Sequence, residues 1–481
     1  MKALRWLGIF LLISAALPGI ALAQTWSHLN HTAPFNAGSA VLLTDGRVLV
    51  HSEQDSSQNW YTLTPDNKGS YINGTWTQAG SMPSGYAPLY FGSVVLPDGR
   101  AVVEGGEYNN LSPVWTNLGA IYDPKTNAWT KVNPPSGWAN IGDAQSVILA
   151  DGTYMQADCC SILSAFFNPS NLTWSAAGIS GKVDSFDEEG WTLLPNGNVL
   201  TVDCNQSDLN HSELYITQNN NWVSGGEVPV ILADAGSHEI GPAVLRPDGT
   251  VFYSGASGHT AVYNSSTGAW TAGPDFGSGN DVADGPAALE INGKVIIMTS
   301  PGVFNTNSSF YEWDGTSLTK IPGPPNAPSD SSYYGHFVEL PTGQLLFTDF
   351  SSDVEIFTPA GHANSAWAPV ITGGSAVKLV NISRGQTYTL QGKQFNGLSQ
   401  GAAYGDDYQS ATNYPIVAIR NKATGHIFFA KSHDHSSMGV ATGNTTVSTK
   451  FDVPSNTETG ASQLFVIANG IRSNPASVTV Q

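Results

Sequence analysis

The chain has 481 residues, with 19 basic and 38 acidic side chains and a formal net charge of −19 at pH 7. Such an acidic surface repels nucleic acid and anionic membranes, so neither is expected as a partner. Charged residues make up only 12% of the chain, whereas glycine contributes 51 residues and tryptophan 13. This composition excludes a disordered chain and favours a turn-rich β protein with one large and one smaller domain.

The first 23 residues have the pattern of a signal peptide. Lys2 and Arg5 precede an apolar run that ends near Ile20, and the small residues Ala21 and Ala23 suit cleavage. The apolar run is short and no second long one follows, so we expect no membrane span. The mature chain is expected to begin near Gln24 and to be secreted or periplasmic.

A hairpin pattern recurs seven times at intervals of 44 to 53 residues. Each copy is an apolar run, a tight turn and a second apolar run. The turns begin at Asp45, Asp98, Asp151, Asn196, Asp248, Asn292 and Thr342. Asp-Gly and Asn-Gly are favoured in two-residue hairpin loops, so each copy predicts a pair of antiparallel strands.

A third strand with an aromatic residue follows each hairpin, and a fourth usually carries a tryptophan. The clearest fourth strands contain Trp129, Trp174, Trp222 and Trp270. Four strands at a period near 50 are typical of kelch blades, so we predict a seven-bladed kelch-type β-propeller over residues 24–367. Trp26 looks like an isolated fourth strand that would complete the seventh blade, although Trp367 competes for that position.

After Trp367 the hairpin period stops and shorter strands alternate with polar turns. This pattern predicts an all-β tail, an Ig-like β-sandwich over residues 368–481. Within it, His433 and His435 flank Asp434, and His-x-His on a strand points both rings to one face, where they could ligate a metal. A loop that packs onto the mouth of the propeller is an equally good interpretation.

Counting eight residues back from each turn finds the positions that enter the inner strands. They are Ala37, Tyr90, Asp143, Glu188, Ile240, Asp284 and Tyr334. Three are acidic, and further polar residues lie one or two positions away, so we predict a central mouth ringed by carboxylates with aromatic walls. Confined carboxylates repel one another, which raises pKa values or recruits a cation such as Ca²⁺. The alternative is that these residues cap strands.

The mouth and the tail supply the candidate site residues. The candidate catalytic residues are Glu188, Glu189, Glu239, Tyr334 and His336. The candidate metal ligands are Asp143, Asp284, His433 and His435.

Three cysteines, Cys159, Cys160 and Cys204, are too few for a disulfide framework. Cys159 and Cys204 occupy the same position in the third and fourth repeats. A bridge from Cys204 to Cys159 or Cys160 is therefore one possibility, if neighbouring blades approach closely enough. Buried free thiols are the other.

The repeats, the double glycine in Glu104-Gly105-Gly106-Glu107 and the Ser432-His433 pair in an Ig-like tail resemble the galactose oxidase and glyoxal oxidase family. The resemblance implies a copper ion on the propeller axis, held by two tyrosines and two histidines, with one tyrosine cross-linked to a cysteine. The family's Tyr-His falls at Tyr333-Tyr334-Gly335-His336, where a tyrosine matches and the adjacent histidine does not, and His433 could match the ligand from the sandwich. Residues 24–158 contain no cysteine to serve as the cross-linking partner. The unmatched positions predict a degenerate copper site.

Three classes of function follow from these patterns. The first is binding of an extracellular carbohydrate or cell-wall ligand at the mouth, because aromatic rings stack on sugars and carboxylates accept hydroxyl hydrogen bonds. The second is an enzyme, either an oxidase with an altered copper site or a carboxylate-based hydrolase or isomerase acting on a sugar. The third is a structural envelope protein. We expect a monomer, with calcium or copper as the candidate metal ions.

Overall fold

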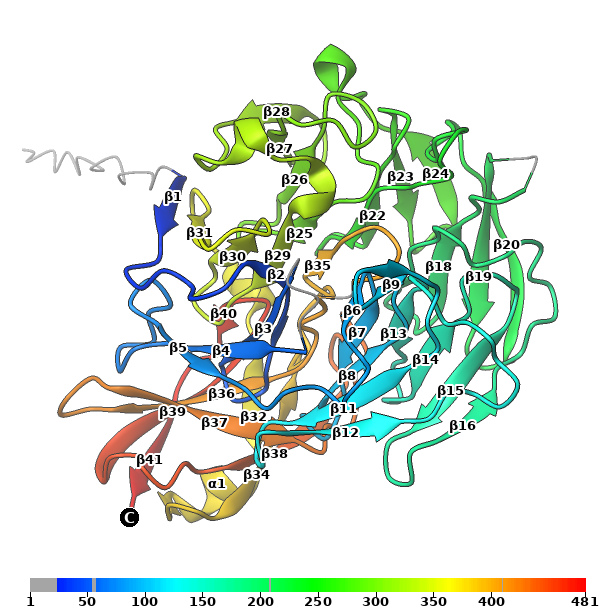
Figure 1. Cartoon of the computed structure of the whole chain (residues 1–481). Coiled ribbons are helices and arrows are strands. Elements are labelled where there is room, and N and C mark those ends of the chain that lie inside the picture. The colour runs from blue at the N-terminus through cyan, green and yellow to red at the C-terminus, as the bar shows by residue number, and fades with distance from the viewer. Residues whose placement is uncertain (1–23, 54–57, 207–208, 409) are drawn as a thin grey trace, which may run out of the picture.

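The computed structural model describes residues 24–53, 58–206, 209–408 and 410–481 (Figure 1). The predicted signal peptide, residues 1–23, lies outside the described residues. The described chain consists almost entirely of strands and turns. Its helices are α1 (Ser375–Leu379) and the 3-10 turns η1 (Gly277–Gly279), η2 (Ala327–Ser329), η3 (Ser332–Tyr334) and η4 (Ser365–Trp367). None of these is long and apolar enough to cross a membrane.

Seven sheets of the described chain share one plan, in which four antiparallel strands lie side by side. The first three sheets contain β2 (Ala37–Leu42), β3 (Val48–Ser52), β4 (Trp60–Thr64) and β5 (Thr75–Gln78); β7 (Gly92–Val95), β8 (Ala101–Glu104), β11 (Gly119–Asp123) and β12 (Ala128–Val132); and β13 (Ser146–Ile148), β14 (Tyr154–Ala157), β15 (Ser164–Asn168) and β16 (Thr173–Ala176). The next two contain β17 (Thr192–Leu193), β18 (Val199–Val202), β19 (His211–Ile216) and β20 (Asn221–Glu227); and β21 (Ala243–Leu245), β22 (Thr250–Ser254), β23 (Thr260–Asn264) and β24 (Ala269–Ala272).

The last two of these sheets recruit strands from distant parts of the chain. The sixth contains β25 (Ala287–Leu289), β26 (Val295–Thr299), β27 (Ser309–Trp313) and β28 (Leu318–Ile321), with β35 (Ala402–Ala403) added at its edge. The seventh contains β29 (His336–Glu339), β30 (Leu345–Thr348) and β31 (Glu355–Thr358), with β1 (Thr25–His28) as its fourth strand. A small separate sheet is formed by β6 (Pro88–Leu89), β9 (Tyr108–Asn109) and β10 (Ser112–Pro113).

Each of the seven predicted hairpins is present as the first two strands of a sheet. At Asp45 and Asp98 the turn carboxylate accepts a hydrogen bond from the backbone N–H two residues later. The glycines that follow, Gly46 and Gly99, have φ of 79° and 81°. Glycine adopts this left-handed conformation at little cost, so the Asp-Gly pair fixes the turn and hence the strand register.

The predicted aromatic pairs of the third and fourth strands lie directly opposite each other. The pairs are Tyr122 with Trp129, Phe167 with Trp174, Tyr215 with Trp222, and Tyr263 with Trp270. Their ring centroids lie 4.8 to 5.2 Å apart, within the range of favourable aromatic contacts. The recurring tryptophan therefore holds the outermost strand onto its sheet.

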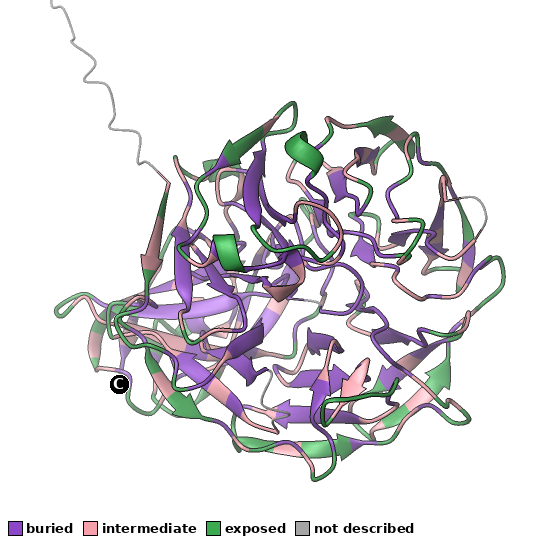
Figure 2. Cartoon of the chain, turned by 45° about the horizontal axis from the view of Figure 1, so that its top comes forward, coloured by how far each residue is buried: buried purple, intermediate pink, exposed green. Residues whose placement is uncertain are grey.

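The first strands of the seven sheets contact one another in a closed circle, in the order β29, β2, β7, β13, β17, β21, β25 and back to β29. Burial falls along each sheet, so that the first strands are buried and the fourth are largely exposed (Figure 2). The seven sheets thus surround a common centre, and the first strand of each sheet lies next to that centre.

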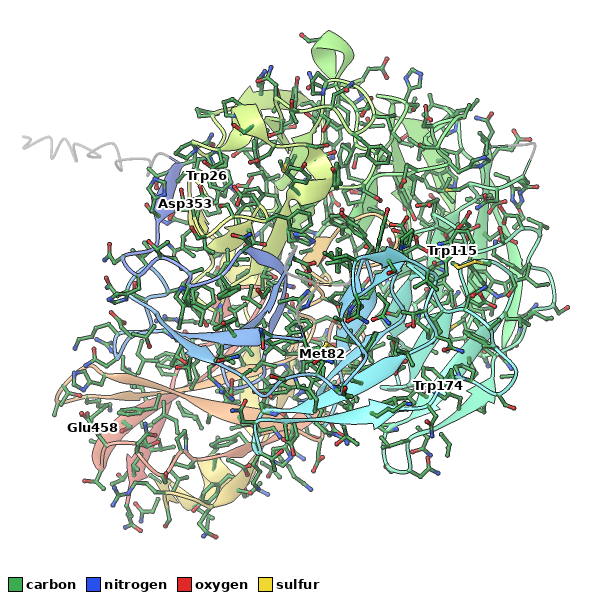
Figure 3. The ribbon with its side chains drawn as sticks, in the orientation of Figure 1. Trp26, Met82, Trp115, Trp174, Asp353 and Glu458 are labelled. Atoms are coloured by element: carbon green, nitrogen blue, oxygen red, sulfur yellow. A yellow bond between two sulfur atoms is a disulfide. The ribbon has the colours of Figure 1, made fainter. Side chains whose placement is uncertain are left out.

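The seventh sheet joins the beginning of the described chain to residues far along it. Trp26 in β1 lies opposite Phe357 in β31, at the periphery of the molecule (Figure 3). Its ring also contacts Phe310, Phe337 and Phe347. The prediction for Trp26 is confirmed, whereas the competing Trp367 lies in η4.

The C-terminal strands form one nine-stranded sheet of β32 (Val370–Gly373), β33 (Asn381–Ile382), β34 (Thr387–Lys393), β36 (Ile416–Asn421), β37 (Ile427–His433), β38 (Val447–Asp452), β39 (Gly460–Ala468), β40 (Ile471–Arg472) and β41 (Ala476–Val480). The first half of β37 pairs with β36 and its last three residues pair with β38. Leu390 and Phe451 from one part of the sheet share a buried core with Val417 and Leu464 from the other.

Residues 398–408, which we call the axial segment, leave this C-terminal region and run into the centre of the seven sheets. β35 lies there, far from the rest of the C-terminal strands (Figure 1). The segment is anchored where Leu289 N–H donates to Gly401 O at 2.6 Å and where Leu193 N–H donates to Gln400 Oε1 at 2.8 Å. Two different sheets therefore hold it in place.

Candidate functional site

A cavity of about 460 Å³ lies where the axial segment meets the beginnings of the first strands. It is lined by Leu89, Tyr90, Glu107, Tyr108, Leu111, Asp143, Glu188, Glu239, Asp284, Phe304, Tyr333, Asp406 and Asp407. Seven of these residues are acidic and three are tyrosines. All thirteen belong to the described residues, and none of them is basic. The cavity is therefore strongly acidic with aromatic walls.

The repeat positions that were expected to enter the inner strands supply much of this lining. Tyr90, Glu188 and Asp284 line the cavity from equivalent places before β7, β17 and β25. Their φ angles are 51°, 60° and 52°. A non-glycine residue in this left-handed region costs about 1–3 kcal/mol, and such strain is concentrated at functional sites. The same strained turn thus precedes the first strand of three different sheets and places a side chain at the cavity each time.

Three of the carboxylates converge. Glu188, Glu239 and Asp284 each bring an oxygen atom to within 4.8 Å of the other two. Asp143 faces the same cavity and is only 8% exposed, and its Oδ1 has no hydrogen-bond partner among the described residues. The prediction that Asp143, Glu188 and Asp284 lie at a common central mouth therefore agrees with the geometry, whereas their role stays a prediction.

Burial and mutual repulsion act together on these carboxylates. Burial raises the pKa of Glu188 well above its ordinary value, and the neighbouring Asp143 and Asp284 carboxylates raise it further. Burial and the Glu107 carboxylate raise the pKa of Asp143 in the same way. The pKa of Asp284 rises to about 7, mainly through burial. At neutral pH the group cannot carry all its negative charges without compensation.

The axial segment contributes Asp406 and Asp407, which the sequence analysis missed. Burial raises the pKa of both; the Asp407 carboxylate raises that of Asp406 further, and the Asp284 carboxylate raises that of Asp407. Two flanking tyrosines fix them: Tyr404 Oη donates to Tyr333 O at 2.8 Å, and Tyr408 Oη accepts from Tyr90 N–H at 2.8 Å. The signal was the motif Tyr-Gly-Asp-Asp-Tyr at 404–408, which lies outside the repeats from which the mouth was deduced.

Glu189 does not line the cavity, contrary to the prediction. Its side chain turns to the opposite side of the chain from Glu188 and lies 2.8 Å from Lys182 Nζ. Lys182 Nζ also lies 2.5 Å from Asp184 and from Glu213. Since all four groups are buried, this is an ion-paired cluster within the fold rather than part of the cavity.

The prediction placed Tyr334 and His336 at the mouth, but neither side chain lines the cavity. The 3-10 turn η3 presents Tyr333 to the cavity instead, and the Tyr334 ring packs on Tyr333 and Phe350 with centroids 4.5 and 5.3 Å apart. His336 is 2% exposed and stacks on Tyr404 with centroids 5.1 Å apart. Burial lowers the His336 pKa to about 4, so the ring is neutral.

His433 and His435 lie at the other end of the seven sheets. The His435 backbone N–H donates to Pro97 O beside a hairpin turn, and the His435 ring bonds Thr449 Oγ1 at 2.9 Å. The His433 ring lies 3.3 Å from Asp452. Among the described residues neither histidine belongs to a group of three close metal-binding atoms. Both histidines thus lie away from the mouth, because β37 packs on the turns, and their role as metal ligands stays a prediction.

The expectation of buried free thiols holds for Cys204 alone. Cys159 and Cys160 form a disulfide between adjacent residues, and Cys204 is a buried free thiol. A bridge between blades is thus excluded. Cys204 Sγ lies 3.3 Å from the Glu188 carbonyl oxygen, directly behind the cavity wall.

Comparisons with known proteins support the fold. No family model matches the chain. Kelch-like protein terF from Aspergillus terreus is 29% identical over 133 residues, which are 27% of this chain and 27% of that protein, so the match spans about a quarter of the curated relative. A solved fungal alcohol oxidase in complex with copper superposes with a TM-score of 0.51 at 13% identity, covering 95% of this chain and 98% of that one. Virginiamycin B lyase from Staphylococcus aureus has a TM-score of 0.47 at 8% identity, over 70% of this chain and 99% of that one.

At these identities the structural likeness concerns the fold. The four-stranded sheets, the kelch-like relative and the oxidase structure together support a kelch-type propeller fold. Its scaffold resembles that of the galactose oxidase family.

Proposed function

We propose that this chain is a secreted, seven-bladed kelch propeller with a C-terminal Ig-like sandwich, and that its central cavity binds an extracellular carbohydrate or cell-wall ligand. The closed circle of seven first strands supports seven blades over residues 24–367. The core shared by the two parts of the C-terminal sheet supports a sandwich over residues 368–481. The signal-peptide pattern supports secretion.

The lining of the cavity is the observation on which this function rests. Carboxylates accept hydrogen bonds from sugar hydroxyls, and the tyrosine rings offer faces for the apolar side of a sugar. The volume of about 460 Å³ falls within the range of roughly 300–1,000 Å³ that is usual for small-ligand sites. Tyr108 and Leu111 stand at its wall and are partly or largely exposed, so a ligand can reach them.

Copper-radical chemistry does not fit these residues. Neither a histidine nor a cysteine is among the residues that line the cavity, all of which are described. His336 lies behind it in ring contacts with Tyr404 and Tyr408, and Cys159 is consumed in a disulfide. We therefore propose that the copper site of the galactose oxidase family is degenerate here, and we derive no oxidase step.

A carboxylate-based hydrolase or isomerase acting on a sugar is the second candidate. It is favoured by the close approach of Glu188, Glu239 and Asp284, since carboxylic acids with raised pKa values can act as general acids. A Glu239→Gln variant separates the two functions. An enzyme loses kcat while it still binds the sugar, whereas a binding protein shows no turnover in either form.

Calorimetric titration of the purified protein with a panel of neutral and acidic oligosaccharides tests the proposal. We expect Tyr108→Ala and Glu107→Gln to weaken binding by about tenfold, the equivalent of one lost stacking or charge-assisted contact. Glu227→Gln, at an exposed position on β20, serves as the control and should bind like the original chain. Binding that is equal in all three variants would place the ligand elsewhere.

A further inference from the structure

Two groups of carboxylates lie close together near the fourth sheet, and one of them contains its own cation. Asp184, Glu189, Asp203 and Glu213 bring four oxygen atoms within 4.8 Å of one another. The Lys182 ammonium lies among them, 2.5 to 2.8 Å from three of the four. In this first group the fold itself supplies the positive charge that buried carboxylates need.

The second group brings three carboxylates as close together as those of the first group, without such a charge. Glu188, Glu239 and Asp284 converge within 4.8 Å, and Glu107, Asp143, Asp406 and Asp407 line the same cavity. No lysine, arginine or histidine is among the described residues that line it.

Asp143 gives an independent indication of a ligand. This side chain lines the cavity, is 8% exposed, and its Oδ1 has no hydrogen-bond partner among the described residues. A buried carboxylate oxygen without a partner is costly, and a ligand within the cavity would satisfy it.

We propose that the cavity binds one divalent cation of the calcium class, held by Glu188, Glu239 and Asp284, with Asp143 beside them. All of the donor atoms are oxygens, which suit a hard cation that takes six to eight oxygen ligands. Copper and zinc sites are typically built with imidazole or thiolate ligands, which this lining lacks. The cation would neutralise the carboxylates of the second group as Lys182 neutralises those of the first.

Three carboxylates leave coordination positions open toward the cavity. Adjacent hydroxyl groups of a sugar could occupy these positions and so bind through the cation. This last step rests on the proposed carbohydrate binding, whereas the cation site itself does not.

The site can be tested on the full mature chain after removal of metals with EDTA. Titration with TbCl₃ should give sensitised luminescence that saturates at one ion per chain, because Tyr90 and Tyr333 line the same cavity. CaCl₂ should displace the terbium and raise the melting temperature, whereas MgCl₂ should do so weakly, since Mg²⁺ dehydrates reluctantly. Failure of both Ca²⁺ and Tb³⁺ to bind stoichiometrically at millimolar concentration would overturn the proposal without any variant.

The variants Asp284→Asn and Glu188→Gln keep the side-chain volume and remove one charge. Each should weaken Tb³⁺ and Ca²⁺ binding roughly tenfold or more, since charge count sets affinity at such sites. Glu339→Gln is the control, because Glu339 is a buried carboxylate that bonds Thr412 and Asn469 outside the cavity. Equal affinities in all four proteins would overturn the assignment of ligands.

Cation and sugar binding are measured separately, so the two proposals can fail separately. Calcium binding without any sugar binding would retain the cation site and refute the carbohydrate. Sugar binding that is unchanged by EDTA would refute a bridging role for the cation.

Discussion

Lys182 shows how much one buried side chain can determine. It is 7% exposed and pairs with Glu189, which precedes β17, and with Glu213 on β19. Those carboxylates raise its pKa, which overcomes the opposing effect of burial, so the ammonium stays charged. The stability of the fold therefore depends on this one ammonium group, which neutralises several buried carboxylates.

We predict that Lys182→Met destabilises the protein by about 3–5 kcal/mol, because it leaves buried carboxylates without their counter-charge. The variant would then fold most favourably with Glu189 and Glu213 protonated. The loss should therefore be smaller at pH 5 than at pH 8, as measured by denaturant unfolding at both values.

Lys450→Met is the control for this experiment. Lys450 pairs with Asp434, and the two side chains are 49% and 48% exposed, so removal should cost less than about 1 kcal/mol. Equal losses in the two variants would show that the burial of Lys182 is not what matters.

At the scale of the element, β1 depends on one aromatic cluster. Trp26 contacts Phe310, Phe337, Phe347 and Phe357, which belong to the sixth and seventh sheets. Without β1, the backbone of β31 becomes an unpaired edge, and such edges promote aggregation.

We predict that Trp26→Ala lowers stability by about 3–5 kcal/mol, as large-to-small changes at packed aromatic sites do, and that the variant aggregates on mild heating. Denaturant unfolding measures the loss of stability, and light scattering during a thermal ramp measures the aggregation. Trp367→Ala should leave the aggregation temperature nearly unchanged, since η4 does not pair with β31.

The repeated hairpins could be placed from the sequence, whereas the axial segment could not. The hairpin turns at Asp45 and its six equivalents follow from local backbone preferences, which act within a few residues. The axial segment has no local signature, because Asp406 and Asp407 reach the cavity only through contacts with remote strands. Three of the seven carboxylates that line the cavity could be predicted for the same reason: Asp143, Glu188 and Asp284 occupy a repeated position.

The errors at single residues have an equally plain cause. The turn at Glu188 directs the two neighbouring side chains apart, so Glu188 enters the cavity and Glu189 meets Lys182. The side on which each lies depends on the strained φ of Glu188, which a residue count does not reveal.

For the whole molecule, buried acids make stability depend on pH. Burial raises the pKa of Glu339 to about 7 and, together with Glu312, that of Glu290 to about 8. Between the unfolded pKa near 4.5 and these values the folded state binds more protons than the unfolded state. The stabilising contribution is present at lower pH and is lost as pH rises through the folded pKa.

We therefore predict that the melting temperature, measured by calorimetry in EDTA, falls as pH rises from 5 to 8. Glu339→Gln should reduce this fall, because the amide does not titrate, and the exposed Glu227→Gln should not. A melting temperature that rises over this interval would contradict the prediction.

The pairing of Trp26 with Phe357 also sets an order of events during folding. The partners are 331 residues apart in sequence. Closing so long a loop costs conformational entropy, and this cost must be overcome before the contact forms. Asp406 and Asp407 arrive later still along the chain, after every first strand that surrounds them. During synthesis the cavity thus cannot exist until nearly the whole chain has emerged, and its completion marks the end of folding rather than its beginning.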